Sequence, residues 1–149
     1  MEFNVIYKGD VFLFKVGSIF IPVTDLEHSS KWYEEHFQVK LIGQWEGGAG
    51  FYFPDSAVQL GLIEVQIPQP SQFLNRHAQQ NTYFNLITED IVSLHKTFID
   101  QGLTVRQINE FGGMKYFDCA DPDGNVLSIV EEVPGSPFHS EQVEKLQQK

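Results

Sequence analysis

The chain has 149 residues, of which 42% are hydrophobic and 13% aromatic, so it is long enough for one domain with its own core. Its formal net charge of −10 would repel a phosphate backbone and argues against nucleic acid as a partner. The single cysteine, Cys119, excludes an intrachain disulfide and suits a reducing cytoplasm. No apolar run approaches the roughly 20 residues that cross a bilayer, and no signal-peptide pattern is present. We therefore expect a cytoplasmic protein without a membrane partner.

Two segments of the chain resemble each other at a constant offset of 65 residues, the first at 18–33 and the second at 83–98. Each begins with alternating apolar residues, as a half-buried strand does, and continues with apolar residues at helical spacing. Asp25 and Asp90 stand where a helix N-cap belongs, and Gly102 follows the second helix at the position where glycine commonly ends a helix. The repeat predicts two copies of a strand followed by a helix.

Three short strands are expected after each helix, separated by turns rich in Gly, Pro and Asp. They fall near Lys40–Trp45, Gly50–Phe53 and Val58–Ile63 in the first copy, and near Thr104–Asn109, Met114–Ala120 and Val126–Val130 in the second. Asp121-Pro122-Asp123-Gly124 joins the last two strands, because Pro presets one turn φ and Gly supplies a positive φ.

We therefore expect one α+β domain over residues 1–149, built from two βαβββ units. The first unit covers residues 17–65 and the second 82–132. Residues 66–81, rich in Pro and Gln, are expected to be a linker, and 133–149 a polar tail with a short helix. Val11–Phe14, before the first unit, is expected to add an edge strand.

This arrangement resembles the vicinal-oxygen-chelate superfamily, which includes glyoxalase I, bleomycin-resistance proteins and extradiol dioxygenases. The duplicated strand-helix segment and the turn at Asp121–Asn125 carry the resemblance, which covers residues 17–132. It implies that each unit forms half of an open, cup-shaped barrel of mixed sheet with helices outside. In the enzymes of the family, the cup holds a divalent metal bound by His, Gln or Glu, which polarises an oxygen pair on the substrate.

The resemblance also locates the metal-ligand positions of the family in this sequence. They are occupied by Ser18, Gly61, Tyr83 and Ser128. Neutral hydroxyls are poor ligands for divalent transition metals, and glycine offers no side chain, so no cofactor is expected. The five histidines form no metal-ligand pattern with the acidic residues, and His36 is expected to be solvated on the first helix.

Strand alternation, combined with the resemblance, identifies side chains that face the cup. They are mostly apolar with a few polar tips, a mixture typical of small-molecule pockets. The predicted ligand-binding residues are Ser18, Phe20, Trp45, Tyr52, Gln59, Tyr83, Asn85 and Ser128. The alternative is that these side chains fill the cup and leave no cavity.

Four functions are compatible with these observations. The leading interpretation is a metal-independent protein of this superfamily that binds a small aromatic or amphipathic molecule. The net negative charge of the chain is compatible with a cationic ligand. The alternative is a metal-dependent lyase or dioxygenase of the same superfamily with non-standard ligands. A third is an interaction module that forms a homodimer through its apolar N-terminal arm. A metal-free enzyme with Tyr83 as its acid stays open, although the sequence offers no base.

Overall fold

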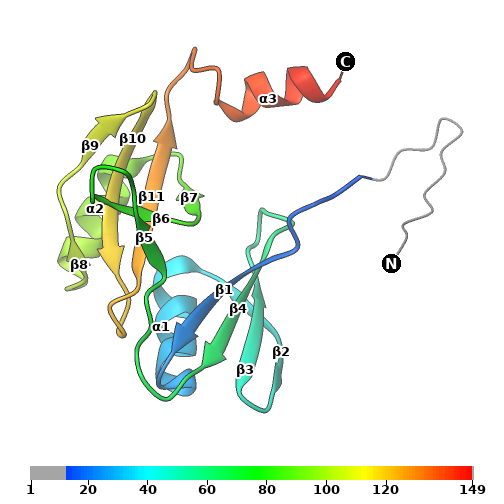
Figure 1. Ribbon diagram of the computed structural model, residues 1–149, viewed down its shortest axis with the longest axis vertical. Helices are drawn as coiled ribbons and strands as arrows, with labels where there is room; N and C mark the ends of the chain where they lie inside the picture. Colours follow the sequence, from blue (N-terminus) through cyan, green and yellow to red (C-terminus); the bar gives the residue numbers. More distant parts are fainter. Residues whose placement is uncertain (1–12, 149) are drawn as a thin grey trace, which may run out of the picture.

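The computed structural model describes residues 13–148, which form two βαβββ units (Figure 1). The first unit consists of β1 (Ser18–Val23), α1 (Leu26–Phe37), β2 (Lys40–Trp45), β3 (Gly48–Tyr52) and β4 (Gln59–Glu64). The second consists of β7 (Asn85–Ile87), α2 (Ile91–Asp100), β8 (Thr104–Val105), β9 (Asn109–Phe111), β10 (Met114–Ala120) and β11 (Val126–Glu132). The predicted α+β fold is therefore confirmed.

Both helices begin at the predicted caps. The Asp25 carboxylate accepts a hydrogen bond from the His28 N–H at 3.0 Å, and the Asp90 carboxylate accepts one from the Ser93 N–H at 3.1 Å. These bonds satisfy backbone donors that the first helical turn leaves without a partner. Gly102 follows α2 with φ of +82°, the left-handed conformation that glycine adopts without strain.

Each unit forms an open sheet in which the first and last strands pair in parallel. The first sheet has the order β1-β4-β3-β2, and the second has the order β7-β11-β10-β8, with β9 also paired to β10. Phe20 lies opposite Gly61 in the first sheet, and Asn85 lies opposite Ser128 in the second. Since Phe20 and Asn85 are 65 positions apart, the two sheets share one register. The sequence repeat is thus a structural repeat.

The two units share one hydrophobic core. Ile21 and Val23 of β1 are buried on the side of α1, as their alternation predicts. At the centre of the core, the Phe98 ring of α2 lies 5.5 Å from Phe37 of α1 and 6.0 Å from Phe117 of β10, measured between ring centroids. In Figure 1 both helices lie behind the sheets, so the opposite sheet faces, here called the outer faces, open on the same side.

The segment between the units contains a hairpin that the sequence did not predict. Its strands are β5 (Gln72–Leu74) and β6 (Gln80–Thr82). The Asn75 side-chain oxygen accepts hydrogen bonds from the His77 and Gln79 N–H groups, and Ala78 has φ of +58°. This side-chain-capped turn closes the hairpin without the Gly that marks most tight turns. The linker interpretation of residues 66–81 missed it for that reason.

Smaller differences concern the strands and the termini. The predicted strand Thr104–Asn109 is two short strands, β8 and β9, which pair with opposite ends of β10. Leu13 and Phe14 belong to no strand, whereas Val11 and Phe12 of the predicted edge strand lie outside the described residues. The predicted tail helix is α3 (Ser140–Gln147). None of the helices in the described part of the chain is both long and apolar enough to cross a membrane.

Candidate functional site

A row of glycines crosses the outer face of the first sheet. Gly43, Gly50 and Gly61 lie opposite one another on β2, β3 and β4, and Phe20 on β1 completes the row. The alternate positions, such as Phe51, are buried in the core, so this row faces away from α1. Because glycine has no side chain, the three glycines leave a low strip across the sheet.

Two aromatic rings rest against this strip. A Cβ atom at Gly61 would lie 2.6 Å from Cδ1 of Phe20, and one at Gly50 would lie 3.6 Å from Cζ3 of Trp45. A Cβ atom at Gly48 would collide with the Trp45 indole. Both rings nevertheless stay open, since Phe20 is 62% exposed and Trp45 52%. The strip and the rings form an accessible apolar platform of the kind on which planar molecules stack.

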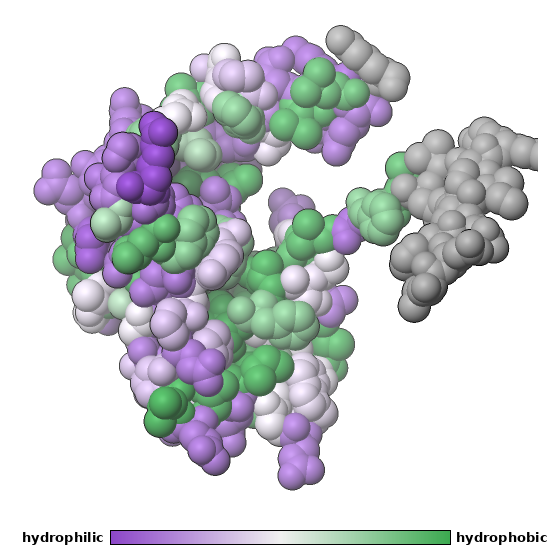
Figure 2. Space-filling view, viewed as in Figure 1, coloured by the Kyte–Doolittle hydropathy of each residue, from purple (hydrophilic) through white to green (hydrophobic). Residues whose placement is uncertain are grey.

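A polar row borders the platform on the same face. Ser18 of β1 lies opposite Gln59 of β4, and Gln59 lies opposite Tyr52 of β3. Tyr52 is 42% exposed. The structure therefore brings five of the predicted residues together, the apolar Phe20 and Trp45 and the polar Ser18, Gln59 and Tyr52. In Figure 2, which has the same view as Figure 1, hydrophobic residues are exposed over the lower part of the molecule, where the first unit lies.

Of the other three predicted residues, Asn85 and Ser128 belong to the second sheet and Tyr83 lies just before it. Asn85 of β7 lies opposite Ser128 of β11, and Ser128 lies opposite Asp118 of β10. Tyr83 precedes β7, is 71% exposed, and has its ring centroid 4.9 Å from that of Phe73 in β5. No hydrogen bond or ring contact within the described residues joins this group to the first-sheet group. A single hollow shared by both groups therefore stays a prediction.

Sequence reasoning missed Asp118, which stands beside Ser128 on the outer face. Its neighbours Phe117 and Cys119 are buried, so strand alternation alone places Asp118 on the opposite side. The signal is present in the sequence, but the site residues predicted for the second unit come only from its first and last strands.

Helix α3 overhangs the outer face of the second sheet. A hollow of about 480 Å³ lies between them, with lining residues that include Asn85, Ile87, Val130, Phe138 and Val143. The helix is attached by Glu132, whose carboxylate accepts a 2.7 Å hydrogen bond from the Ser140 N–H and another from the Ser140 hydroxyl. The C-terminal tail, predicted as a polar tail with a short helix, therefore contributes to the surroundings of Asn85.

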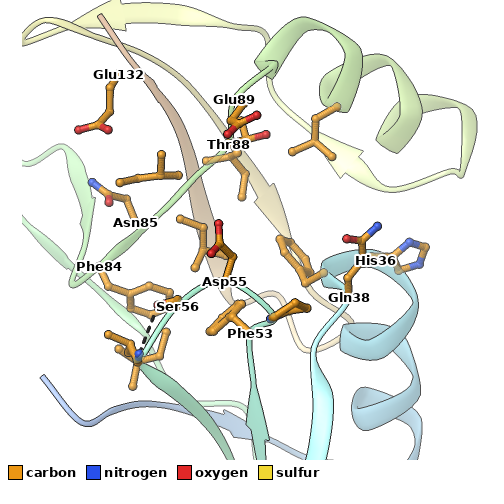
Figure 3. A pocket seen from close by; sticks show the side chains of 18 of the residues that line it. His36, Gln38, Phe53, Asp55, Ser56, Phe84, Asn85, Thr88, Glu89 and Glu132 are labelled. Carbon is orange, nitrogen blue, oxygen red and sulfur yellow. Dashed lines mark hydrogen bonds between the residues drawn. The ribbon is translucent and has the colours of Figure 1, made fainter. Parts of the chain in front are cut away.

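A larger groove, of about 910 Å³, lies between the two units (Figure 3). Of the predicted residues, its lining includes Asn85. His36, predicted to be solvated, is half-buried there: its Nδ1 lies 2.9 Å from Oε1 of Gln101, and its ring packs edge-on against Phe98. The prediction for His36 was wrong because α1 packs against α2 as well as its own sheet. The pattern within one helix cannot show a contact with the other unit.

Two strongly shifted titratable groups lie in the core. Burial, followed by the neighbouring Asp121 carboxylate, raises the pKa of Tyr33 well above its usual value. Burial, followed by Asp118 and Asp121, raises the pKa of the Cys119 thiol to about 12. Both groups therefore stay protonated near neutral pH. Cys119 behaves as a small packed hydrophobe rather than as a nucleophile.

The metal-ligand positions of the resembled family do not fit a divalent metal in this protein. They hold Ser18, Gly61, Tyr83 and Ser128, which offer neither an imidazole nor a carboxylate nor a thiolate. The Phe20 ring stands over Gly61, so a ligating side chain at that position would have to displace it. Within residues 13–148, no group of three or more His, Cys, Asp or Glu side chains is arranged to hold a metal.

Sequence comparison now identifies the family. The model of the Glyoxalase/Bleomycin resistance protein/Dioxygenase superfamily matches residues 15–129, a range that contains β1 and reaches into β11. The chain therefore belongs to this superfamily. No curated protein matches the chain significantly.

Solved structures support the same fold. A superfamily member from Sphaerobacter thermophilus DSM 20745 is 22% identical with a TM-score of 0.66, covering 80% of this chain and 98% of its own. TnmS3, an antibiotic binding protein from Streptomyces sp. CB03234, is 17% identical with a TM-score of 0.65, covering 83% of this chain and 99% of its own. The fosfomycin resistance protein FosX from Listeria monocytogenes is 11% identical with a TM-score of 0.64, covering 85% of this chain and 100% of its own.

Proposed function

We propose that this protein binds a small, flat, aromatic or amphipathic molecule on the outer face of the first sheet, without a metal ion. The observation that carries this proposal is the pair of exposed rings, Phe20 and Trp45, that rest on the glycines of that face. A planar ligand stacked on two such rings gains about 0.5–1.5 kcal/mol per ring pair beyond the burial of its apolar area.

The polar row supplies the orientation. Ser18, Gln59 and Tyr52 border the platform and offer hydroxyl and amide groups to the edge of a bound molecule. Binding pockets combine a large apolar area with a few such groups, which fix the direction of the ligand. Asn85 and Ser128, on the outer face of the second sheet, and Tyr83, just before it, complete the proposed site when a ligand spans both units.

The relatives include binding proteins and proteins named for reactions. TnmS3 is described as an antibiotic binding protein, whereas another similar structure, from Agrobacterium tumefaciens, is described as a lactoylglutathione lyase. Membership alone therefore does not choose between binding and catalysis. The lack of metal-ligating side chains at Ser18, Gly61, Tyr83 and Ser128 favours binding. A cytoplasmic location, suggested by the single thiol, and a homodimer stay predictions.

Fluorescence of Trp45 tests the proposal directly. The chain has two tryptophans, so a Trp32→Phe variant reports on Trp45 alone. We expect at least one member of a panel of planar naphthoquinones and anthraquinones to quench this fluorescence saturably. Excess EDTA should leave the affinity unchanged. The matched Trp45→Phe variant, which retains Trp32, should show no saturable quenching.

Two results would count against the proposal. The first is the absence of saturable quenching with every compound in the panel. The second is a stoichiometric divalent metal in protein purified without chelator, whose removal abolishes binding. That second result would favour the metal-dependent enzyme instead.

A further inference from the structure

The two units meet at two junctions that the sequence repeat relates to each other. His36 and Gln101 are 65 positions apart, and their side chains contact each other across the boundary between the units. In a pair of units that pack through their helices, such a contact between repeat equivalents indicates an axis of approximate two-fold symmetry close by. Each contact on one side of this axis therefore has an expected counterpart on the other.

The first junction is closed by hydrogen bonds. The turn after β10 reaches back to the first unit, where the Tyr33 hydroxyl donates to the Asp121 carboxylate at 2.7 Å. The Thr24 N–H donates to the Asp123 carboxylate at 3.0 Å, and the Asn125 amide donates to a backbone carbonyl of β1 at 2.8 Å. These bonds join residues about a hundred positions apart and hold the turn against the first unit.

The second junction lacks the phenol, the carboxylates and the side-chain amide that make these bonds. Equivalent residues of α1 and α2 are 65 positions apart in the sequence. Equivalent residues of the last strands, β4 and β11, are 67 positions apart, because Gly61 in β4 corresponds to Ser128 in β11. The counterparts are therefore Phe98 for Tyr33, Glu89 for Thr24, Ser56 for Asp123 and Val58 for Asn125. Phe98 has no hydroxyl and Val58 has no amide. Within the described residues, no hydrogen bond joins the turn at 54–58 to residues 88–98, and this junction is the 910 Å³ groove.

The open groove has an apolar floor and an acidic rim. Its floor includes Ile19, Phe37, Phe53, Phe84, Leu86 and Ile129. Asp55, from the turn before β4, and Glu89, from the segment before α2, extend their carboxylates toward the same space from opposite sides (Figure 3). The lining contains no Lys or Arg, and the ion pairs found among residues 13–148, Lys31–Glu27 and Lys96–Asp100, lie elsewhere.

We propose that this groove binds an organic cation with an apolar body, such as a hydrophobic amine or a quaternary ammonium or phosphonium ion. The cationic centre lies between Asp55 and Glu89, where both carboxylates attract it. The apolar body covers the aromatic and aliphatic floor. This site is distinct from the platform of Phe20 and Trp45, because the groove floor consists of residues on the helix side of the sheets and neither ring lines the groove; Asn85, at the groove edge, is the one residue assigned to both sites.

The chemistry of the groove excludes other classes of occupant. An anion would meet the carboxylates of Asp55, Glu89 and Glu132, with no Lys or Arg in the lining to offset them. A bare divalent metal would find no group of three or more His, Cys, Asp or Glu side chains arranged to hold it within residues 13–148, whereas calcium takes six or more oxygens. An apolar cation satisfies both the rim and the floor.

Two ions of nearly equal shape and opposite charge provide the test. Tetraphenylphosphonium and tetraphenylborate differ chiefly in the sign of their charge, so calorimetry with the full chain isolates the electrostatic contribution. We expect tetraphenylphosphonium to bind and tetraphenylborate to bind at least tenfold more weakly. Asp55→Asn and Glu89→Gln should each weaken cation binding roughly threefold, and the double variant about tenfold, as expected for exposed charges.

A matched control separates the groove from the overall charge of the protein. Glu46→Gln combined with Glu110→Gln removes the same two charges from surfaces outside the groove and should leave binding within twofold of wild type. Ser56→Trp, which adds bulk to the groove wall, should abolish cation binding without changing the net charge. Trp45→Phe should leave cation binding intact, even if it abolishes binding at the outer face.

Three results would overturn the proposal: equal affinity for the two ions, wild-type cation affinity in the Asp55→Asn, Glu89→Gln double variant, or loss of cation binding in Trp45→Phe. The last result would assign the cation to the outer-face site. Conversely, failure of the naphthoquinone panel at Trp45 would leave the groove proposal standing, so the two proposals fail independently.

Discussion

The Tyr33 hydroxyl, on α1, donates a 2.7 Å hydrogen bond to the Asp121 carboxylate, 88 positions further along the chain. Asp121 is buried, and its carboxylate also accepts from the Asp123 N–H and from the N–H and side-chain amide of Asn125. Several donors thus compensate one buried charge. The same carboxylate organises the turn after β10 and ties it to the first unit.

Replacing Tyr33 by Phe should destabilise the protein by about 1.5–3 kcal/mol, the usual worth of a hydrogen bond to a buried charged group. Urea unfolding of the full chain measures the change. Tyr116→Phe is the matched control, because Tyr116 is half-buried and makes no side-chain hydrogen bond within the described residues. That control should stay within about 0.5 kcal/mol of wild type. Equal losses in both variants would show that the Tyr33–Asp121 bond contributes little.

Stability should decline in alkaline solution. The folded protein holds the protons of Tyr33 and Cys119 more tightly than the unfolded chain does, because both pKa values are raised on folding. Their contribution is therefore full below the unfolded pKa values of 9.0 for Cys119 and 10.0 for Tyr33, and it is lost as the pH rises through the folded values. The unfolding free energy, measured by urea titration from about pH 7 to 11, should fall above about pH 9.

Variants separate the two contributions. Cys119→Ala should remove the part of the decline that begins near the pKa of the thiol, and Tyr33→Phe the part that begins near that of the phenol. Tyr116→Phe should leave the decline unchanged. A wild-type unfolding free energy that is flat or rising over this pH range would contradict the assignment of both raised pKa values.

Most of the fold follows from patterns within short stretches of sequence. Alternating residues in β1 and the helical stripe after Asp25 each reflect burial on one side of a single element. The offset between Asp25 and Asp90 then supplied the two-unit architecture. The sequence did not predict the hairpin of β5 and β6, because its turn depends on the Asn75 side chain rather than on Gly. The composition of residues 66–81, rich in Pro and Gln, is that of a linker.

The site was only partly accessible from the sequence, for a physical reason. Strand parity placed Phe20 on the same face as Ser18, since parity depends on a single strand. The groove depends instead on contacts between units, so neither the half-buried His36 nor the opening beside Glu89 could be read from one element. One feature of the sequence does indicate the open groove. Phe98 is the repeat equivalent of Tyr33, so the hydroxyl that closes one junction is missing from the other.

The contact between Trp45 and Gly48 should be visible by fluorescence. Gly48→Ala places a methyl group where the indole lies, so the ring must leave the sheet and enter solvent. In a Trp32→Phe background, the emission of Trp45 should shift to longer wavelength, at a cost of about 1 kcal/mol from overpacking. Gly43→Ala is the matched control, since nothing lies within 4 Å of its added Cβ atom. Unchanged emission in Gly48→Ala would mean that Trp45 does not cover this position in solution.

The cap of α2 should make part of the stability depend on acidic pH. Hydrogen bonds from the backbone N–H and side chain of Ser93 lower the pKa of Asp90 below its usual 3.8. A lowered folded pKa means that the stabilisation is present above the unfolded value and is lost as the pH falls through the folded one. Asp90→Asn retains a capping oxygen without the titrating charge. Thermal unfolding of this variant between about pH 2 and 5 should therefore depend less on pH than that of wild type. Asp100→Asn, at the other end of α2, should leave the cap intact, and an identical pH dependence for Asp90→Asn and wild type would refute the role of the Asp90 charge.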